Sequence, residues 1–395
     1  RSPFHDRLVS AGACMTEAAG FERPGFFAPA GMKPEIEYSY GRQNWFDACA
    51  NECKNTAENV TLFDHSCFVK FAVDGPDACT VLNHVCANDV DVPLGKIVYS
   101  QWLNGNGGIE ADVTVTRLTE TSYLVVTIST SQRRDFAWLR RHVPADAKVF
   151  IRDMSSGLPM LALMGPKSRA LLQAASPADF SNEAFPFGTS KEIDLGYARV
   201  RASRVTFVGE LGWEIYMPAE FAAHVFDRLT EAGEPFGLRH GGFFALNSLR
   251  MEKGYRHWGH DIGEEDTPIQ AGLSFAVAYD KPGGFIGRDA LLKQKELGVP
   301  NRRLVQFALT EADAPLLYHQ EPIWRGNKII GSITSGAYGH RIGASLGMGY
   351  VENDGGVDDA YLSALPLEIE IAWKRYPVRA QLKPWYDASA LRVKS

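Results

Sequence analysis

Residues 62–85 read LFDHSCFVKFAVDGPDACTVLNHV, and residues 160–175 read MLALMGPKSRALLQAA. Each stretch begins with an apolar segment typical of a strand, passes through Gly-Pro, and continues with helical spacing of its apolar residues. Proline suits the first turn of a helix, because the amide hydrogen that it lacks would have no partner there. Two such strand–Gly-Pro–helix units in one chain predict a duplicated α+β module.

The rest of the chain divides around this module. Residues 37–295 are expected to form the duplicated α+β region, with further strands and helices between and after the two units. From residue 302 the pattern changes to short alternating segments separated by turn residues, as in RLVQFAL and LEIEIA. A small all-β domain is therefore expected over residues 296–395.

The N-terminal segment, residues 1–36, contains ERPGFFAPAGMKPE, a run rich in Pro and Gly. This composition predicts an irregular, extended connector that lies on another surface. The chain starts at Arg1, and no charged-then-apolar signal pattern follows. We therefore expect it to be a piece of a longer protein.

Composition excludes several classes of protein. The chain has 395 residues, 45% of them hydrophobic, which is ample for a packed core. The net charge of −6 and the dispersed Lys and Arg residues argue against a nucleic-acid surface. No apolar run approaches the roughly 20 residues that a membrane span needs. By default the protein is expected in the cytoplasm, or in the mitochondrial matrix if the source is eukaryotic.

The six cysteines form no C-x-x-C pair. Cys49 and Cys53 are four residues apart, which would place them on one face of a helix. Free thiols in a reducing compartment are expected rather than a disulfide framework. The stretch HWGHD, residues 257–261, offers two histidines, but the glycine between them argues against a helix presenting both to a metal. No metal site is predicted.

A glycine-rich loop lies in WLNGNGGIEADVTVTRL, residues 102–118. It lacks the GK[ST] ending of a P-loop, and a strand rather than a helix follows it, so it matches no phosphate-binding fingerprint. Two carboxylates, Asp112 in GGIEAD and Glu214 in GELGWEIYMP, stand out between glycines and aromatic residues. Spacing alone leaves both as solvated residues at strand ends.

Several segments, taken in order, resemble the aminomethyltransferase (glycine-cleavage T-protein) family. They are LFDHSCFVKFAVDGPDA, YSQWLNGNGGIEADVTV, LALMGPKSRALL, VGELGWEIYMP, ALNSLRMEKGYRHWGHDI, FIGRDAL and GSITSG with SLGMGYV. The set also resembles the folate-binding C-terminal portion of dimethylglycine and sarcosine dehydrogenases, which looks the closer branch. The resemblance implies an α+β fold, a three-domain cloverleaf around a central cavity, closed by a C-terminal β-barrel.

The resemblance also implies roles for individual residues. Asp112 matches an aspartate beside the reacting folate amine, and the glycines before it would let backbone and pterin approach closely. Glu214 matches the glutamate that holds the pterin, and Tyr99 matches a position that contacts folate. Arg250 matches an arginine on the cavity wall, which could pair with Glu214 or reach the folate; the alternative is an ion pair at a helix end. Phe207 stands where the family usually has tyrosine, so it keeps the ring and loses a hydroxyl that could contact the cofactor.

The implied function is tetrahydrofolate-dependent one-carbon transfer. The carbon of an N-methyl amine such as dimethylglycine or sarcosine would be captured as 5,10-methylenetetrahydrofolate. The first 29 residues, RSPFHDRLVSAGACMTEAAGFERPGFFAP, resemble the stretch that follows the FAD domain in those flavoenzymes. T-proteins are expected to lack this stretch. FAD would therefore belong to a missing N-terminal domain or subunit. A standalone folate-dependent methyltransferase or demethylase is the first alternative, and a non-catalytic folate-binding or scaffold domain is the second.

Overall fold

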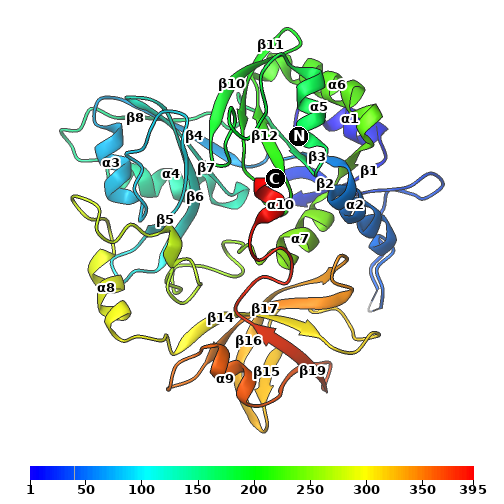
Figure 1. Cartoon of the computed structure of the whole chain (residues 1–395), viewed down its shortest axis with the longest axis vertical. Coiled ribbons are helices and arrows are strands. Elements are labelled where there is room, and N and C mark those ends of the chain that lie inside the picture. Colours follow the sequence, from blue (N-terminus) through cyan, green and yellow to red (C-terminus); the bar gives the residue numbers. More distant parts are fainter. Residues whose placement is uncertain (40) are drawn as a thin grey trace.

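The chain folds into three lobes in a computed structural model that describes residues 1–39 and 41–395 (Figure 1). The first lobe contains a six-stranded sheet in the order β10-β11-β12-β9-β3-β13, antiparallel except for the parallel pair of β13 and β3. Its strands are β3 (Val60–Asp64), β9 (Met160–Met164), β10 (Ser190–Leu195), β11 (Ala198–Ser203), β12 (Gly212–Tyr216) and β13 (Leu238–Gly241). Its main helices are α2 (Phe46–Glu58), α5 (Ser168–Ala175), α6 (Ala222–Gly233) and α7 (Phe243–Glu252).

The second lobe is built on a five-stranded antiparallel sheet in the order β5-β6-β7-β4-β8. Its strands and helices are β4 (Val69–Asp74), α3 (Ala78–Val85), β5 (Ile97–Leu103), β6 (Ile109–Thr119), β7 (Ser122–Thr127), α4 (Gln132–Arg141) and β8 (Phe150–Asp153). After α7 of the first lobe, a long connection with few regular elements ends in α8 (Arg288–Glu296) and leads to the third lobe.

The third lobe is a closed barrel in the strand order β14-β17-β16-β15-β18-β19. Its elements are β14 (Arg302–Leu309), β15 (Pro322–Arg325), β16 (Lys328–Gly339), β17 (Ala344–Glu352), α9 (Asp359–Ala364), β18 (Leu367–Ile371) and β19 (Lys374–Gln381). The predicted α+β fold with a small all-β C-terminal domain is confirmed. Among the described helices, none is both long and apolar enough to cross a membrane.

Both strand–Gly-Pro–helix units form, one in each of the first two lobes. β9 leads into α5 and β4 leads into α3. The two glycines share one backbone conformation, with φ of 132° at Gly165 and 135° at Gly75. A side chain would not fit at either position. A Cβ at Gly165 would lie 2.4 Å from the carbonyl oxygen of Asn59, and a Cβ at Gly75 would lie 2.1 Å from that of Lys148. The glycines therefore serve the turn from strand to helix, as their repeated spacing predicts.

The prediction that residues 1–36 have irregular structure is wrong. This segment contains α1 (His5–Ser10) and a hairpin of β1 (Ala13–Ala18) and β2 (Phe21–Phe27). Pro24 and Gly25, which suggested irregular structure, lie at a bulge of this two-stranded sheet. An edge strand tolerates proline, and a bulge absorbs the extra residue. Phe4 is fully buried in the core of the first lobe.

One buried carboxylate ties this hairpin to the first lobe. Glu52 of α2 accepts a hydrogen bond from the amide of Phe27 at 2.7 Å and another from the amide of Gly242 at 2.8 Å. It therefore connects β2, α2 and the start of α7.

The end of the chain leaves the barrel and returns to the first lobe, where α10 (Leu391–Lys394) lies far from β19 (Figure 1). Arg392 contacts the buried Glu210 with 2.7 Å between Nε and Oε2. Lys253, just after α7, pairs with Asp387 at 2.9 Å. The strap over residues 382–395 thus joins the first and third lobes, which the predicted boundary at residue 296 did not foresee.

Candidate functional site

A buried polar cluster on the second sheet contains Asp112. Asp112 lies on β6 directly opposite Gln101 of β5, and the amide of Gln101 donates to Oδ1 of Asp112 at 2.9 Å. Tyr99 lies two residues before Gln101, on the same face of β5, and its hydroxyl is near enough to Asp112 to lower the pKa of that carboxyl. The hairpin of β5 and β6 therefore holds the carboxylate from two directions.

The environment of Asp112 changes its protonation. Burial raises the pKa of Asp112 to about 6, while hydrogen bonds from Gln101 and Tyr99 and the positive charge of Arg256 act in the opposite direction. A carboxylate with such a pKa can hold or release a proton near neutral pH. Asp112 and Tyr99 also remain half-buried rather than fully enclosed, so both keep accessible surface for a ligand.

A second polar cluster lies on the first sheet, around Glu214 of β12. The hydroxyl of Tyr216, two residues along the same face, donates to Oε2 of Glu214 at 2.6 Å. His65, which follows β3, has its Nδ1 3.9 Å from Oε1 of the same carboxylate. His65 is 1% exposed, and neither of its ring nitrogens has a hydrogen-bond partner in the part of the chain that the structure describes. One oxygen of Glu214 is thus held by Tyr216, and the other faces an unpaired imidazole.

The two clusters lie on adjoining sheets. Tyr216 packs in one apolar cluster with Leu124 and Val126 of β7, and β7 pairs with β6, the strand of Asp112. Arg256, in the connection after α7, is half-buried and places its charge near Tyr99 and Asp112. Tyr350 of the barrel strand β17 also lies near Arg256. Arg256 therefore has the Asp112 cluster of the second lobe and Tyr350 of the barrel as neighbours.

Phe207 lies in the loop before β12, with its ring stacked on that of Tyr255 at a centroid distance of 5.9 Å. It also packs against the apolar cluster that contains Val208 and Leu249. A contact between Phe207 and a cofactor stays a prediction.

Arg250 does not pair with Glu214. Its Nη1 lies 2.6 Å from Oδ2 of Asp261, its Nε donates to Asn247, and its side chain is 3% exposed. Asp261 in turn accepts a hydrogen bond from Thr334 of β16 at 2.7 Å. The helix-end ion pair, the alternative that the sequence left open, is what forms here. It links α7 to the barrel, and a contact between Arg250 and a cofactor stays a prediction.

We expect Arg250→Ala to lower the free energy of unfolding by about 3–5 kcal/mol, because it leaves the charge of Asp261 buried without its partner. Chemical denaturation followed by circular dichroism measures this difference. Arg228→Ala is the control, since Arg228 on α6 pairs with an exposed Glu231 at 3.8 Å; its loss should cost less than about 1 kcal/mol. Equal effects of the two substitutions would contradict a structural role for the buried pair.

The glycine-rich loop before Asp112 contacts another loop of the protein. A Cβ at Gly108 would lie 1.8 Å from the carbonyl oxygen of Glu264, and the amide of Ile109 donates to the carbonyl oxygens of Gly263 and Asp266. The expectation that these glycines serve close approach of a pterin is therefore corrected at Gly108. There, the absence of a side chain allows two backbone segments to meet.

Four polar residues of the site were missed from sequence. Gln101 and Tyr216 carried a signal, because period-two alternation places them on the same faces as Tyr99 and Glu214. Arg256 and His65 carried none, since tertiary packing alone brings them to Asp112 and Glu214.

Two family models match the chain. The N-terminal domain of the glycine cleavage T-protein matches residues 4–281, and the C-terminal barrel domain of that protein matches residues 302–387. The first match begins inside the segment that was expected to be a connector. The helix and hairpin of residues 5–27 are therefore part of the family domain.

The chain is similar to one part of an oxidase and to one part of a dehydrogenase. The 4-methylaminobutanoate oxidase (formaldehyde-forming) of Paenarthrobacter nicotinovorans is 43% identical over 396 residues, which is 100% of this chain and 47% of that protein. Human mitochondrial sarcosine dehydrogenase is 33% identical over 100% of this chain and 47% of its own length. The chain thus spans about half the length of these relatives.

The solved structure of the glycine cleavage system aminomethyltransferase T from Bartonella henselae matches the same fold. It superposes with a TM-score of 0.82 at 25% identity, covering 98% of both chains. With the family models on both parts of the sequence, this match accounts for all three lobes. The chain belongs to the aminomethyltransferase (glycine-cleavage T-protein) family.

Proposed function

We propose that this chain transfers a one-carbon unit from an N-methyl amine to tetrahydrofolate, the cofactor of its family, and forms 5,10-methylenetetrahydrofolate. The observation that carries the proposal is the setting of Asp112, a half-buried carboxylate whose pKa is raised to about 6 by burial. A group with this pKa is suited to proton transfer near neutral pH.

The residues present fit a folate. Among residues 1–39 and 41–395, no donor forms a hydrogen bond with Oε1 of Glu214, and the Nδ1 of His65 lies 3.9 Å from it. Adjacent N–H groups of a pterin would suit this acceptor, since a carboxylate can accept two parallel hydrogen bonds. Tyr99, stacked with Phe275 at a centroid distance of 6.1 Å, adds aromatic surface beside Asp112. Glu214 would hold and orient the cofactor, and Tyr99 would pack against it.

Tetrahydrofolate, when bound, supplies the amine nitrogen that takes up the one-carbon unit. Asp112 would accept the proton that this amine loses, and Gln101 keeps Oδ1 of Asp112 fixed while this happens. Tyr99 would stabilise the ionised carboxylate through its hydroxyl. Arg256 adds a positive charge that favours the same ionised state. A positioned base of this kind is worth about 10²–10⁴ in rate.

The donor is proposed from the names of the relatives. One is an oxidase of 4-methylaminobutanoate that forms formaldehyde, and another is a dehydrogenase of sarcosine. Both substrates are secondary N-methyl amines with a carboxylate. We infer that the donor here is of the same class, and that a flavin-containing part of the whole protein, carrying FAD, oxidises it. This chain would then capture the carbon before it is released as formaldehyde.

The proposed role of Asp112 sets a pH dependence. The rate of one-carbon transfer should fall as pH drops through about 6, because the carboxylate becomes protonated and can no longer accept a proton. A pH–rate profile with saturating cofactor measures this, and Asp112→Asn should remove the acidic limb. A profile unchanged by the substitution would contradict the role.

A stability measurement separates this pKa from catalysis. A carboxyl whose pKa rises on folding stabilises the fold below its ordinary pKa, and this stability is lost as pH rises through the folded value. Between pH 4 and 6, the free energy of unfolding of wild type should therefore fall by about 2 kcal/mol relative to that of Asp112→Asn.

The decisive experiment supplies a ¹³C-labelled N-methyl amine to the whole protein that contains this chain, with and without tetrahydrofolate. The proposal expects labelled 5,10-methylenetetrahydrofolate with the cofactor and labelled formaldehyde without it. Labelled 5-methyltetrahydrofolate would instead show direct methyl transfer. Cofactor binding with labelled formaldehyde under both conditions would indicate a non-catalytic folate-binding domain.

A further inference from the structure

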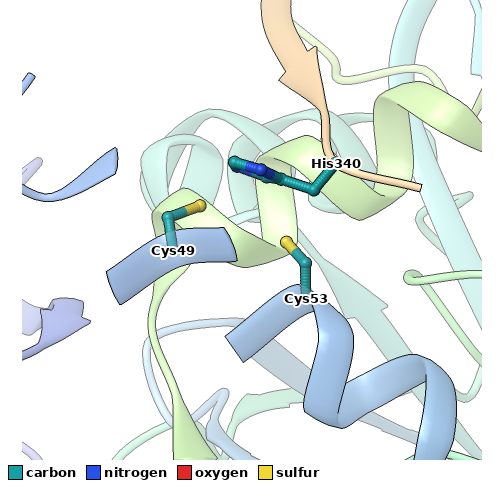
Figure 2. Close-up of side chains that lie close together, drawn as sticks. All are labelled: Cys49, Cys53 and His340. Atoms are coloured by element: carbon teal, nitrogen blue, oxygen red, sulfur yellow. The ribbon is translucent and has the colours of Figure 1, made fainter. Parts of the chain in front are cut away.

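Two cysteines of the first lobe face a histidine of the barrel. Cys49 and Cys53 lie one turn apart on α2, and His340 directly follows β16 (Figure 2). The two sulfur atoms and a ring nitrogen of His340 all lie within 4.8 Å of one another. Among residues 1–39 and 41–395, no further histidine, cysteine or carboxylate joins the group. Three ligand atoms of soft and borderline type therefore converge from two lobes.

Distances and ligand types suit a thiophilic ion. Zinc bonds to sulfur at about 2.3 Å and to imidazole nitrogen at about 2.0–2.1 Å, so tetrahedral ligand atoms are about 3.5–3.8 Å apart. The observed separations are close enough for small side-chain rotations to reach that geometry. Two thiolates would balance the charge of a divalent ion, which matters because Cys49 and Cys53 are 1% and 0% exposed.

The histidine is prepared for this role by its surroundings. Its ring lies against Phe46 and Tyr338, with centroid distances of 4.9 and 5.1 Å. His340 is half-buried, whereas both thiols are buried.

We propose that Cys49, Cys53 and His340 bind one zinc-like ion, with water in the fourth position, and that this ion fastens the barrel to α2. The proposal departs from the sequence-based expectation of no metal. Cys49 and Cys53 supply only two ligands, and the third, His340, lies 287 residues after Cys53, so spacing in the sequence does not connect them. It is independent of folate binding. In the alternative, both thiols are ordinary members of the apolar cluster that includes Ala245 and Leu249.

Titration of the reduced, metal-free chain with Co²⁺ alone tests the proposal, since thiolate ligation gives a charge-transfer absorption. One equivalent of Co²⁺ should bind with that absorption and be displaced by Zn²⁺. His340→Ala and Cys53→Ala should each weaken Co²⁺ binding by at least about 10–100-fold. Substitution of residues that only support metal ligands already causes a loss of this size, and removal of a ligand should cost no less. Cys79→Ser is the control, because Cys79 is the cysteine with more exposure and lies on α3, outside the cluster.

Zn²⁺ should also raise the thermal midpoint of wild type and of Cys79→Ser but not of His340→Ala. His340 is half-buried near the surface, so its alanine variant should fold, and far-UV circular dichroism checks that it does. Absence of the charge-transfer absorption in wild type would overturn the proposal. Unchanged Co²⁺ affinity in His340→Ala, or loss of binding in Cys79→Ser, would overturn it as well.

Discussion

Asp112→Asn is expected to slow one-carbon transfer by about 10²–10⁴-fold, with little change in the affinity for tetrahydrofolate. The substitution removes the proton acceptor but keeps a side-chain oxygen. This oxygen can still accept the hydrogen bond that Nε2 of Gln101 donates to Oδ1 of Asp112 at 2.9 Å in wild type. Single-turnover formation of methylenetetrahydrofolate at saturating cofactor measures the rate of the chemical step. Calorimetric titration measures the affinity separately.

A matched control lies on the same strand. Glu110→Gln changes a carboxylate two residues earlier on β6, where Glu110 pairs with Arg134 and not with the Asp112 cluster. Its transfer rate should stay within a few-fold of wild type. If Asp112→Asn retained the wild-type rate, or if Glu110→Gln lost as much, the assignment of Asp112 as the base would fail.

The second large effect is expected at Glu214. Glu214→Gln should weaken tetrahydrofolate binding by about 10²-fold or more, because hydrogen bonds to a charged group contribute about 1.5–3 kcal/mol each and two are proposed here. The glutamine side chain keeps the shape of glutamate and one acceptor oxygen. Its amide group, however, cannot accept the second N–H of the cofactor. Equilibrium dialysis or calorimetry with the reduced cofactor measures the loss.

Two comparison variants show whether the loss comes from the carboxylate itself. Glu192→Gln changes an exposed carboxylate of the same sheet, paired with Arg201 on the neighbouring strand, and should bind as wild type does. Tyr216→Phe removes the donor that lies 2.6 Å from Oε2 of Glu214 and should weaken binding less than Glu214→Gln. Wild-type affinity in Glu214→Gln would show that this residue does not hold the cofactor.

Much of the fold could be predicted because its signals are local. The Gly-Pro turns at Gly75 and Gly165 identify the two repeated units, and the glycines prove to be required by backbone contacts. Alternating apolar residues identify the barrel strands from residue 302. The hairpin of β1 and β2 was missed because Pro24 and Gly25 read as loop residues, although a bulge in a two-stranded sheet accommodates both.

The site could be predicted only in part, because its contacts join distant parts of the chain. Asp112 and Glu214 were singled out by resemblance, since as isolated carboxylates at strand ends they look ordinary. The imidazole of His65 beside Glu214 and the ion pair of Arg250 with Asp261 depend on which lobes meet. The same holds for His340 opposite Cys49 and Cys53, which no spacing rule connects.

The most direct measurement is a calorimetric titration of this chain with tetrahydrofolate, after circular dichroism has shown that the chain is folded. The expected result is saturable binding to one site per chain, strongly weakened in Glu214→Gln and nearly unchanged in Asp112→Asn. A folded wild-type chain that gives no heat beyond dilution would contradict the proposed folate site, and with it the proposed transfer reaction.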